Sequence, residues 1–273
     1  MGFEEPNFLP RMARMNADKT QPIRNAVVNS AAFFLRELAT AACRGHVGVR
    51  KFSTMETIGV LFDWDGVIID SSRQHEESWE RLAREEGRAL PEGHFKTGFG
   101  KKNEWIIPNL LRWTSEPTEV RRLSLRKEAA YREIIVERGL KALPGVHVFL
   151  ERLREAGVPN CIGSSTHREN ITTILGVLGF EGLFGGMVTS EDVTHGKPHP
   201  DVFLKAAAKT GVAPERCIVF EDALAGIEAG LAGGMKVVGV ATTHELGFLE
   251  GKVHRVVHRL DELTVADLRA LVG

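Results

Sequence analysis

From Ile58 onward, short runs of apolar and β-branched residues alternate with longer segments in which apolar residues recur every three or four positions. The short runs predict buried strands, and the longer segments predict amphipathic helices. The expected strands are 58–63, 159–164, 187–190, 216–222 and 236–241. The expected helices are 145–156, 168–178, 200–210, 223–233 and 264–271. This alternation is typical of an α/β fold with a Rossmann-like parallel sheet and helices on both faces.

The alternation stops between about His75 and Leu140, where the chain shows no convincing strand. The segments there have the pattern of amphipathic helices, and Trp79 and Leu82 share one face of the first of them. We therefore expect an inserted α-helical cap domain. The predicted division is a catalytic α/β core at 56–74 and 141–273, with the cap at 75–140. Because the chain would cross between core and cap twice, the connection would allow a hinge-closing cap.

Residues 1–55 have a different composition, with eight Arg or Lys against four acidic residues and with Ser, Thr and Ala between them. This composition is typical of an organellar transit peptide. The alternative is a surface helix at 26–42 that packs on the core. The first interpretation predicts a chloroplast protein and an extension that can be cleaved, and the second predicts a cytoplasmic one.

The charge balance excludes some classes of partner. The 35 Lys and Arg residues nearly match the 36 Asp and Glu residues, so the net charge of -1 provides no field that would hold nucleic acid or an anionic membrane. The three cysteines are far apart in the sequence, which indicates neither a disulfide framework nor a zinc site. The apolar runs are far shorter than the roughly 20 residues of a membrane-spanning helix. We expect a monomer or small homo-oligomer that acts on a small molecule.

Two carboxylates, Asp63 and Asp65, follow the first predicted strand in the segment DWDGVIID. Side chains two positions apart in an extended segment point to the same side, so both carboxylates can reach one site. An acidic pair after a strand is also common in solvated turns. The pair by itself therefore leaves both interpretations open.

Three further motifs follow predicted strands. Ser164 and Ser165 begin a hydroxyl-rich segment that could hold an anion or cap a helix. Lys197 precedes two prolines that start a helix, and Glu221 and Asp222 end a strand. In open α/β sheets, ligands bind outside the carboxyl ends of the strands, so these side chains are expected to gather at one edge.

In this order, the four motifs resemble those of the haloacid dehalogenase superfamily of phosphohydrolases. The resemblance runs from about Gly59 to Val240. It is strongest to the branch with a helical cap, which includes β-phosphoglucomutases, small sugar-phosphate phosphatases and plant plastid phosphatases of the riboflavin pathway. Members that cleave carbon–halogen bonds lack an acid at the second aspartate, whereas Asp65 is present here.

The resemblance implies a role for each motif. Asp63 would attack phosphorus and form an aspartyl phosphate, and Asp65 would exchange protons with the leaving group and with water. The phosphoryl oxygens would be bound by Ser164, Ser165 and Lys197. The metal site for Mg2+ would be formed by Asp63, Asp65 through its main-chain carbonyl, Glu221 and Asp222.

The same resemblance suggests substrate-contacting residues in and near the cap. His75 stands at the histidine position near the cap hinge, and Lys127 matches a lysine on a later cap helix. Basic residues that could meet a distal substrate group are Lys101, Lys102, His167 and Arg168. Each of them could equally be a solvated surface residue.

The expected function is a magnesium-dependent phosphoric monoester hydrolase that acts on a sugar phosphate or a riboflavin-pathway phosphate. Two alternatives stay open, a phosphomutase of the β-phosphoglucomutase type and a non-catalytic protein that binds a phosphorylated metabolite. The presence of Asp63, Asp65, Lys197 and Asp222 favours an enzyme.

Overall fold

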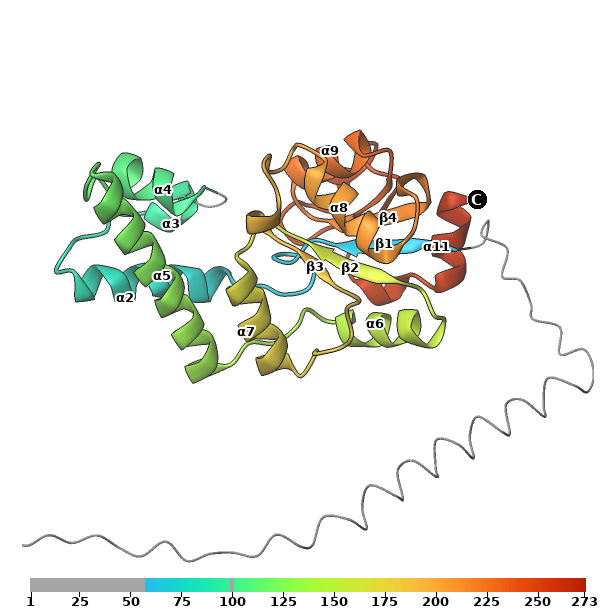
Figure 1. Cartoon of the computed structure of the whole chain (residues 1–273), viewed down its shortest axis with the longest axis horizontal. Helices are drawn as coiled ribbons and strands as arrows, with labels where there is room; N and C mark the ends of the chain where they lie inside the picture. Colours follow the sequence, from blue (N-terminus) through green and yellow to red (C-terminus); the bar gives the residue numbers. More distant parts are fainter. Residues whose placement is uncertain (1–56, 99–100) are drawn as a thin grey trace, which may run out of the picture. The chain divides into compact units, whose positions relative to one another are not determined.

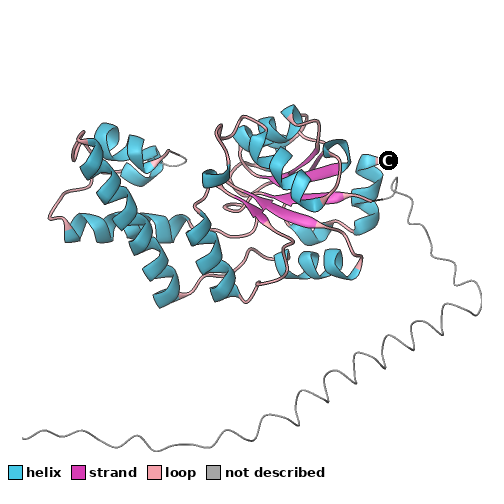
Figure 2. Ribbon diagram, in the orientation of Figure 1, coloured by secondary structure: helices cyan, strands magenta, loops and turns pink. Residues whose placement is uncertain are grey.

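The computed structural model describes residues 57–98 and 101–273, so the transit-peptide prediction for residues 1–55 lies outside the described residues. Its core is a parallel sheet of six strands in the order β3-β2-β1-β4-β5-β6, with helices on both sides (Figures 1 and 2). The strands are β1 (Gly59–Phe62), β2 (Asn160–Gly163), β3 (Met187–Val188), β4 (Cys217–Glu221), β5 (Lys236–Val240) and β6 (Arg255–Val257). The predicted Rossmann-like fold class is confirmed.

The residues of β1 show how the sheet divides its two faces. Val60 and Phe62 belong to one buried apolar cluster, and Leu61 belongs to another. Successive side chains of a strand point to opposite faces, so each face receives its own layer of helices. The first layer contains α6 (Val146–Glu155), α7 (Arg168–Leu178) and α11 (Val265–Val272), and the second contains α8 (Asp201–Thr210) and α9 (Leu224–Ala232).

β1 lies in the middle of the sheet, between β2 and β4. All four of its residues are buried. A strand buried on both faces is expected to be continuously apolar, as the sequence GVLF is. The motifs that follow β1, β2 and β4 therefore emerge side by side at the carboxyl edge of the sheet.

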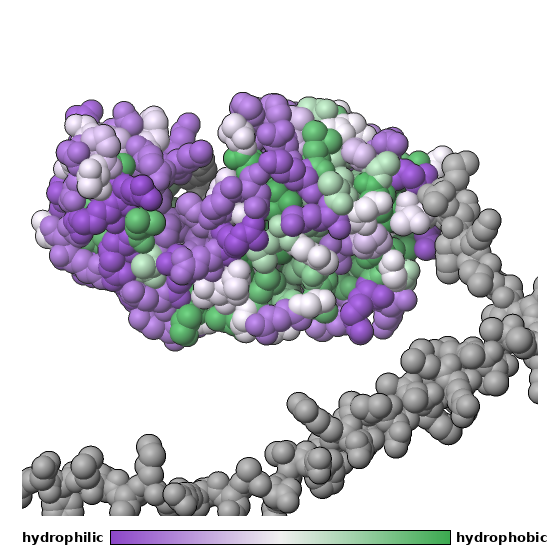
Figure 3. Space-filling model, viewed as in Figure 1, coloured by the Kyte–Doolittle hydropathy of each residue, from purple (hydrophilic) through white to green (hydrophobic). Residues whose placement is uncertain are grey.

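In the described residues of the cap inserted after β1, helices are joined by loops and no strand occurs. It consists of α2 (Ser72–Glu85), α3 (His94–Gly98), α4 (Asn103–Trp105), the π-helix η1 (Ile106–Leu110) and α5 (Pro117–Arg138). Trp79 and Leu82 are buried in its small core, as the sequence predicts. The cap carries Arg–Glu ion pairs, such as Arg126 with Glu85 and Glu133, and the side of the cap visible in Figure 3 is mostly hydrophilic.

Two details differ from the expected strands. β6 was not predicted, because its three residues RVV lie between polar residues and give too short an apolar run. The strand expected at 187–190 ends at Val188, since Ser190–Asp192 form a 3-10 turn, η2. None of the helices in residues 57–98 and 101–273 is long and apolar enough to cross a bilayer.

Candidate active site

Asp63 directly follows β1 and is held in the sheet by its backbone, whose N–H donates to the carbonyl of Phe220 at 3.0 Å. Its carboxylate Oδ1 lies 2.7 Å from Nζ of Lys197, which comes from the loop before α8. Only 8% of the Lys197 side chain is exposed. The structure thus brings the first and third predicted motifs into direct contact.

Lys197 is shared between two carboxylates. Its Nζ also lies 2.7 Å from Oε1 of Glu221, at the end of β4. Burial by itself would lower the pKa of Lys197, but Asp63 and Glu221 outweigh burial and raise it. Lys197 is therefore a fixed positive charge at the point where β1 and β4 end.

Glu221 uses both carboxylate oxygens inside the protein. While Oε1 accepts from Lys197, Oε2 accepts the backbone N–H groups of Asp222 and Ala223 at 2.7 and 2.9 Å. Burial, followed by the nearby Asp63, raises the pKa of Glu221 to about 8. This direction is expected for a buried carboxyl group that has other carboxylates close by. The contacts of Glu221 position the lysine and the turn after β4.

Asp222 is 4% exposed, and Oδ2 of its carboxylate accepts a hydrogen bond from the Thr243 hydroxyl. Burial and then Asp63 raise its pKa to about 6. Space for the two acidic side chains depends on glycines. A Cβ on Gly66, which has φ 78°, would lie 2.0 Å from Oδ2 of Asp222, and one on Gly226 would lie 1.6 Å from Oε1 of Glu221.

Asp63, Glu221 and Asp222, here called the core carboxylate cluster, each offer a ligand oxygen within 4.8 Å of the others. Mg2+ prefers oxygen ligands and usually keeps part of its coordination for water and phosphate. The raised pKa values of Glu221 and Asp222 indicate negative charge that Lys197 alone does not balance. The donor set and its charge therefore fit a magnesium ion.

Asp65 is held by hydroxyl groups on both oxygens. Ser71 donates to Oδ1, and Thr166 donates to Oδ2 at 2.6 Å. Burial is the main reason that the pKa of Asp65 is raised, and the charge of Asp63 adds to it. A raised pKa makes a carboxyl group more readily protonated than an ordinary aspartate, which is the property that a group exchanging protons with a substrate needs.

The segment after β2 lines the same edge. Ser164 is buried, and its Oγ accepts the backbone N–H of Thr166 at 3.1 Å. Ser165 is exposed, and the helix that follows is capped by His167 and not by either serine. The hydroxyl and backbone donors of this segment are therefore arranged as a turn outside the helix, as an anion-binding loop requires.

In the cap, Lys127 is nearly fully buried, at 3% exposed, although it is a lysine on α5. Its Nζ lies 2.7 Å from Nδ1 of His75, whose ring stacks on Tyr131 with centroids 4.0 Å apart. Burial and the Lys127 charge lower the pKa of His75 to about 3, so its imidazole is neutral and can accept the lysine's hydrogen bond. Lys127 also lowers the pKa of Asp65, which shows that its charge reaches the core site.

Glu128 completes this group, and His75, Lys127 and Glu128 are called the cap lysine cluster below. Its Oε1 lies 3.1 Å from Nζ of Lys127. Its Oε2 accepts from Nδ2 of Asn170 at 2.6 Å, which joins α5 to α7. Burial would raise the pKa of Glu128, but Lys127 and the surrounding amides lower it to about 2.

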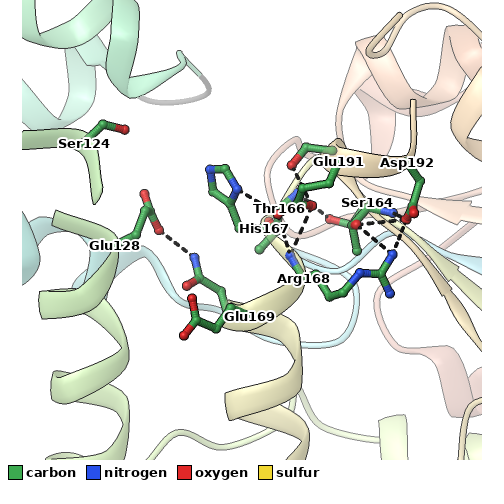
Figure 4. A network of polar contacts seen from close by, with 12 residues as sticks. Ser124, Glu128, Ser164, Thr166, His167, Arg168, Glu169, Glu191 and Asp192 are labelled. Atoms are coloured by element: carbon green, nitrogen blue, oxygen red, sulfur yellow. Dashed lines mark hydrogen bonds and ion pairs between the residues drawn. The ribbon is translucent and has the colours of Figure 1, made fainter. Parts of the chain in front are cut away.

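The other predicted cap and loop residues lie elsewhere. Arg168 pairs with Asp192, and His167 lies 3.0 Å from Glu191, so both side chains are engaged near η2 (Figure 4). Lys101 and Lys102 are exposed. The ring of Trp105 lies 5.5 Å from the Lys101 ammonium. In the described part of the chain, none of these four side chains forms a hydrogen bond or ion pair with a residue of either the core carboxylate cluster or the cap lysine cluster.

Sequence analysis missed several side chains that shape the site: Ser71, Asn103, Glu128, Asn170 and Thr243. Most are short polar residues whose partners lie far away in the sequence, and no local pattern distinguishes them. Lys127 and Glu128 do give a signal. Both fall on the side of α5 that is buried, together with Leu123 and Tyr131, and charged residues at such positions are almost always paired.

Comparison with known proteins gives a match to haloacid dehalogenase-like hydrolases over residues 59–234. A chloroplastic 5-amino-6-(5-phospho-D-ribitylamino)uracil phosphatase of Arabidopsis thaliana is 38% identical over 217 residues, 78% of this chain and 57% of the relative. The present chain thus spans little more than half of that relative's length. Hexitol phosphatase A of Escherichia coli K12 is 35% identical over 77% of this chain and 95% of its own. Both are phosphatases, which supports the predicted enzyme class.

Solved structures of similar fold cover the same region. A family IA hydrolase from Entamoeba histolytica has a TM-score of 0.71 at 27% identity and covers 79% of this chain and 99% of its own. A β-phosphoglucomutase from Clostridium difficile has a TM-score of 0.66 at 25% identity, covering 79% and 97%. The likeness in fold therefore extends to one protein named a hydrolase and one named a mutase.

Proposed function

The chain belongs to the haloacid dehalogenase-like hydrolases, as its four motifs predict, and we propose that it is a magnesium-dependent phosphatase of a small phosphorylated metabolite. The observation that carries this proposal is the meeting of Asp63, Lys197 and the core carboxylate cluster at the ends of β1 and β4. A carboxylate nucleophile, a buried ammonium and oxygen ligands for a metal are what phosphoryl transfer through an aspartyl phosphate requires.

In this proposal Asp63 is the nucleophile. Lys197 holds its Oδ1, which leaves the other carboxylate oxygen to attack phosphorus. The same ammonium, with the hydroxyl and backbone N–H groups of Ser164 and Ser165, binds the equatorial oxygens of the transferring group. Fixed donors of this kind stabilise a transition state in which charge is spread over those oxygens.

Asp65 is proposed as the general acid and base. Its raised pKa allows it to protonate the leaving oxygen and then to accept a proton from the water that hydrolyses the aspartyl phosphate. Ser71 and Thr166 orient its carboxyl group. Opening of those hydrogen bonds would be needed before Asp65 reaches the substrate.

Magnesium would be held by Asp63, Asp222 and the main-chain carbonyl of Asp65. Glu221 would support the site through Lys197 and the turn after β4. When bound, the ion would neutralise negative charge between nucleophile and phosphate. These residues would be unable to bring an anionic substrate close to Asp63 without that charge.

We propose a sugar phosphate or a riboflavin-pathway phosphate as substrate, because the relatives include a hexitol phosphatase and a phosphoribitylamino-uracil phosphatase. Lys127 and His75 would contact the substrate beyond its phosphate, with Lys127 close enough to Asp65 to influence its pKa. Lys101, Lys102 and Arg168 are proposed as secondary contacts. Arg168 would have to leave Asp192 to take part.

The test is phosphate release from a panel of sugar phosphates, nucleotides and flavin precursors, with and without Mg2+. We expect Asp63→Asn, which keeps size but removes the nucleophile, to lower turnover by at least about 10³-fold, with an unchanged melting temperature. Excess chelator should abolish activity, and Asp222→Ala should raise the magnesium requirement. Turnover of Asp63→Asn near the wild-type rate, or full activity in chelator, would contradict the proposal.

The same assay separates the alternatives. A mutase would interconvert sugar 1- and 6-phosphates faster than it releases phosphate and would depend on a bisphosphate primer. Such a result would replace the phosphatase by the β-phosphoglucomutase type, which the fold also accommodates. Binding of phosphometabolites without turnover would indicate the non-catalytic alternative.

We also propose a plastid location, because the 38% identical plant relative is chloroplastic and residues 1–55 are basic, with Ser, Thr and Ala between the basic residues. The proposal is tested by fusing residues 1–55 to a fluorescent protein in plant cells. Import into plastids with cleavage of the extension is expected. Retention of the uncleaved fusion in the cytoplasm would contradict it.

A further inference from the structure

Two histidines and an aspartate gather on the loop that carries Lys197, outside the core carboxylate cluster. Nδ1 of His195 lies 3.5 Å from Oδ2 of Asp201, and Nδ1 of His199 lies 3.1 Å from Oδ1 of the same carboxylate. Ligand atoms from the three residues all lie within 4.8 Å of one another. The two imidazole centroids are 4.7 Å apart, and one nitrogen of each ring lies beside the Asp201 carboxylate.

These separations match those of a metal site. Imidazole nitrogen and carboxylate oxygen bind Zn2+ at about 2.0–2.2 Å, which puts neighbouring ligands of a tetrahedral ion about 3.3–3.6 Å apart. The nitrogen-to-oxygen distances of 3.1 and 3.5 Å lie close to that range. Nδ1 of His199 also accepts the backbone N–H of Asp201 at 3.4 Å, so it would exchange that hydrogen bond for the ion.

The charge of Asp201 is also uncompensated by permanent cations. Within the described ranges 57–98 and 101–273, its ion-pair partners are His195 and His199 alone. Both histidines are largely exposed, at 65% and 48% of the side chain. A divalent cation from solvent could therefore reach this carboxylate and would add positive charge beside it.

The backbone reduces the entropy that metal binding would cost. Pro198 and Pro200 flank His199 and fix their own φ angles. The His199 N–H donates to the Gly196 carbonyl at 3.0 Å, and Asp201 begins α8. Two ligands therefore come from a stiff turn and the first residue of a helix.

We propose that His195, His199 and Asp201 form a second metal site, which takes Zn2+ or another borderline divalent ion and leaves one position for water. Two imidazoles and one carboxylate suit such ions, whereas Mg2+ avoids nitrogen ligands. The site is separate from the core carboxylate cluster, whose donors are all oxygens. Because Lys197 lies between the two histidines in the sequence, an ion bound here would stiffen the loop that presents it.

The ligand chemistry allows a direct test on the full chain. Zinc binding is measured by calorimetry in excess Mg2+, which keeps the core carboxylate cluster occupied. We expect one equivalent of Zn2+ to bind, with an affinity that decreases at acidic pH because imidazole must be neutral to coordinate. Cu2+ is then used as a probe, and pulsed electron paramagnetic resonance should show coupling to two histidine nitrogens.

Matched variants assign the ligands. His195→Gln and His199→Gln should each lower the Zn2+ affinity by at least about tenfold, and the double variant should lose the nitrogen couplings. His258→Gln changes another exposed histidine and should leave both readouts unaltered. Melting curves without zinc confirm that the variants are folded, and only the wild type and the control should gain thermal stability when zinc is added.

Unchanged zinc affinity and nitrogen coupling in the double variant would place the ion elsewhere and overturn the proposal. Absence of zinc binding by the wild type in excess Mg2+ would overturn it as well. In either case, the three residues would form only histidine–aspartate ion pairs at the start of α8. Neither result bears on the proposed phosphatase, because the test does not rely on turnover.

Discussion

The core carboxylate cluster and the cap lysine cluster are both buried groups of charges, yet their carboxyl groups respond in opposite directions. In the core, the pKa of Glu221 is raised to about 8 and that of Asp222 to about 6. In the cap, the pKa of Glu128 is lowered to about 2. All three are largely buried, so burial alone does not set the direction.

The difference comes from the balance of charge and of hydrogen-bond donors. In the core, the ammonium of Lys197 pairs with Asp63 and Glu221, and Asp222 adds a third carboxylate without an ion pair of its own to that lysine. Glu128 has Lys127 beside it and accepts from Asn103 and Asn170. The core therefore has negative charge in excess, which suits a cation and a reaction, and the cap is already balanced, which suits a structural or recognition role.

Among the variants that test this difference between core and cap, the largest effect, on turnover, is expected for Asp65 in the core. Asp65→Ala should slow hydrolysis of an alkyl phosphate by about 10² to 10⁴-fold, since proton transfer to a poor leaving group is lost. An aryl phosphate, which leaves without protonation, should be affected far less. Asp70→Asn, at an exposed neighbouring position, is the control. Equal losses on both substrates would mean that Asp65 is not the acid.

A large loss of stability is expected when the charge of Lys127 in the cap is left without its carboxylate partner. Glu128→Gln leaves Lys127 buried without its carboxylate, which should cost about 3–5 kcal/mol of unfolding free energy. Glu133→Gln on the same helix removes a carboxylate that is 47% exposed and should cost about 1 kcal/mol or less. Chemical denaturation measures both. Similar values for the two variants would show that Lys127 does not depend on Glu128.

The cap should also make the protein sensitive to acid through His75. Its folded pKa of about 3 lies below the reference value of 6.5, so the unfolded state binds the proton first and stability is lost as the pH falls from 6.5 towards 3. When Mg2+ is present, the free energy of unfolding should decrease by about 2 kcal/mol between about pH 6.5 and about pH 5. It should be smaller in His75→Gln and unchanged in His147→Gln, an exposed histidine. Identical pH profiles in all three proteins would contradict this origin.

The smallest effect is expected at the N-terminus. A chain that begins at Thr57 retains every described strand and both charge clusters. If residues 1–55 are a targeting sequence, the melting temperature and kcat/KM of this shorter chain should therefore match those of the full chain. A large decrease in melting temperature would show that the segment packs on the core instead.

The two clusters also differ in how far the sequence predicts them. Asp63, Lys197 and Asp222 each follow or precede an element with a strong local pattern, and the parallel order of β1 and β4 then brings them together. The meeting of these side chains follows from strand order and the motifs. The fold class was predictable for the same reason.

The hydrogen-bond partners in the cap depend on tertiary packing. Asn170 has no local feature that marks it as the partner of Glu128, which is 42 positions away. The guanidinium of Arg168 pairs with Asp192, and no local pattern in the sequence predicts that ion pair. For such long flexible side chains, direction is decided by neighbours that appear only after folding.

Gly226 illustrates how this site limits change at positions without chemistry. Alanine within a helix is ordinarily favoured over glycine by about 1 kcal/mol, and Gly226 lies inside α9. Here, however, the added methyl group would overlap Oε1 of Glu221, which leaves the carboxylate no room to hold Lys197. In a survey of all single substitutions, Gly226 should therefore tolerate substitution nearly as poorly as the acidic residues do. A residue that only leaves space for a carboxylate would then be indistinguishable, by its tolerance, from a residue of the active site.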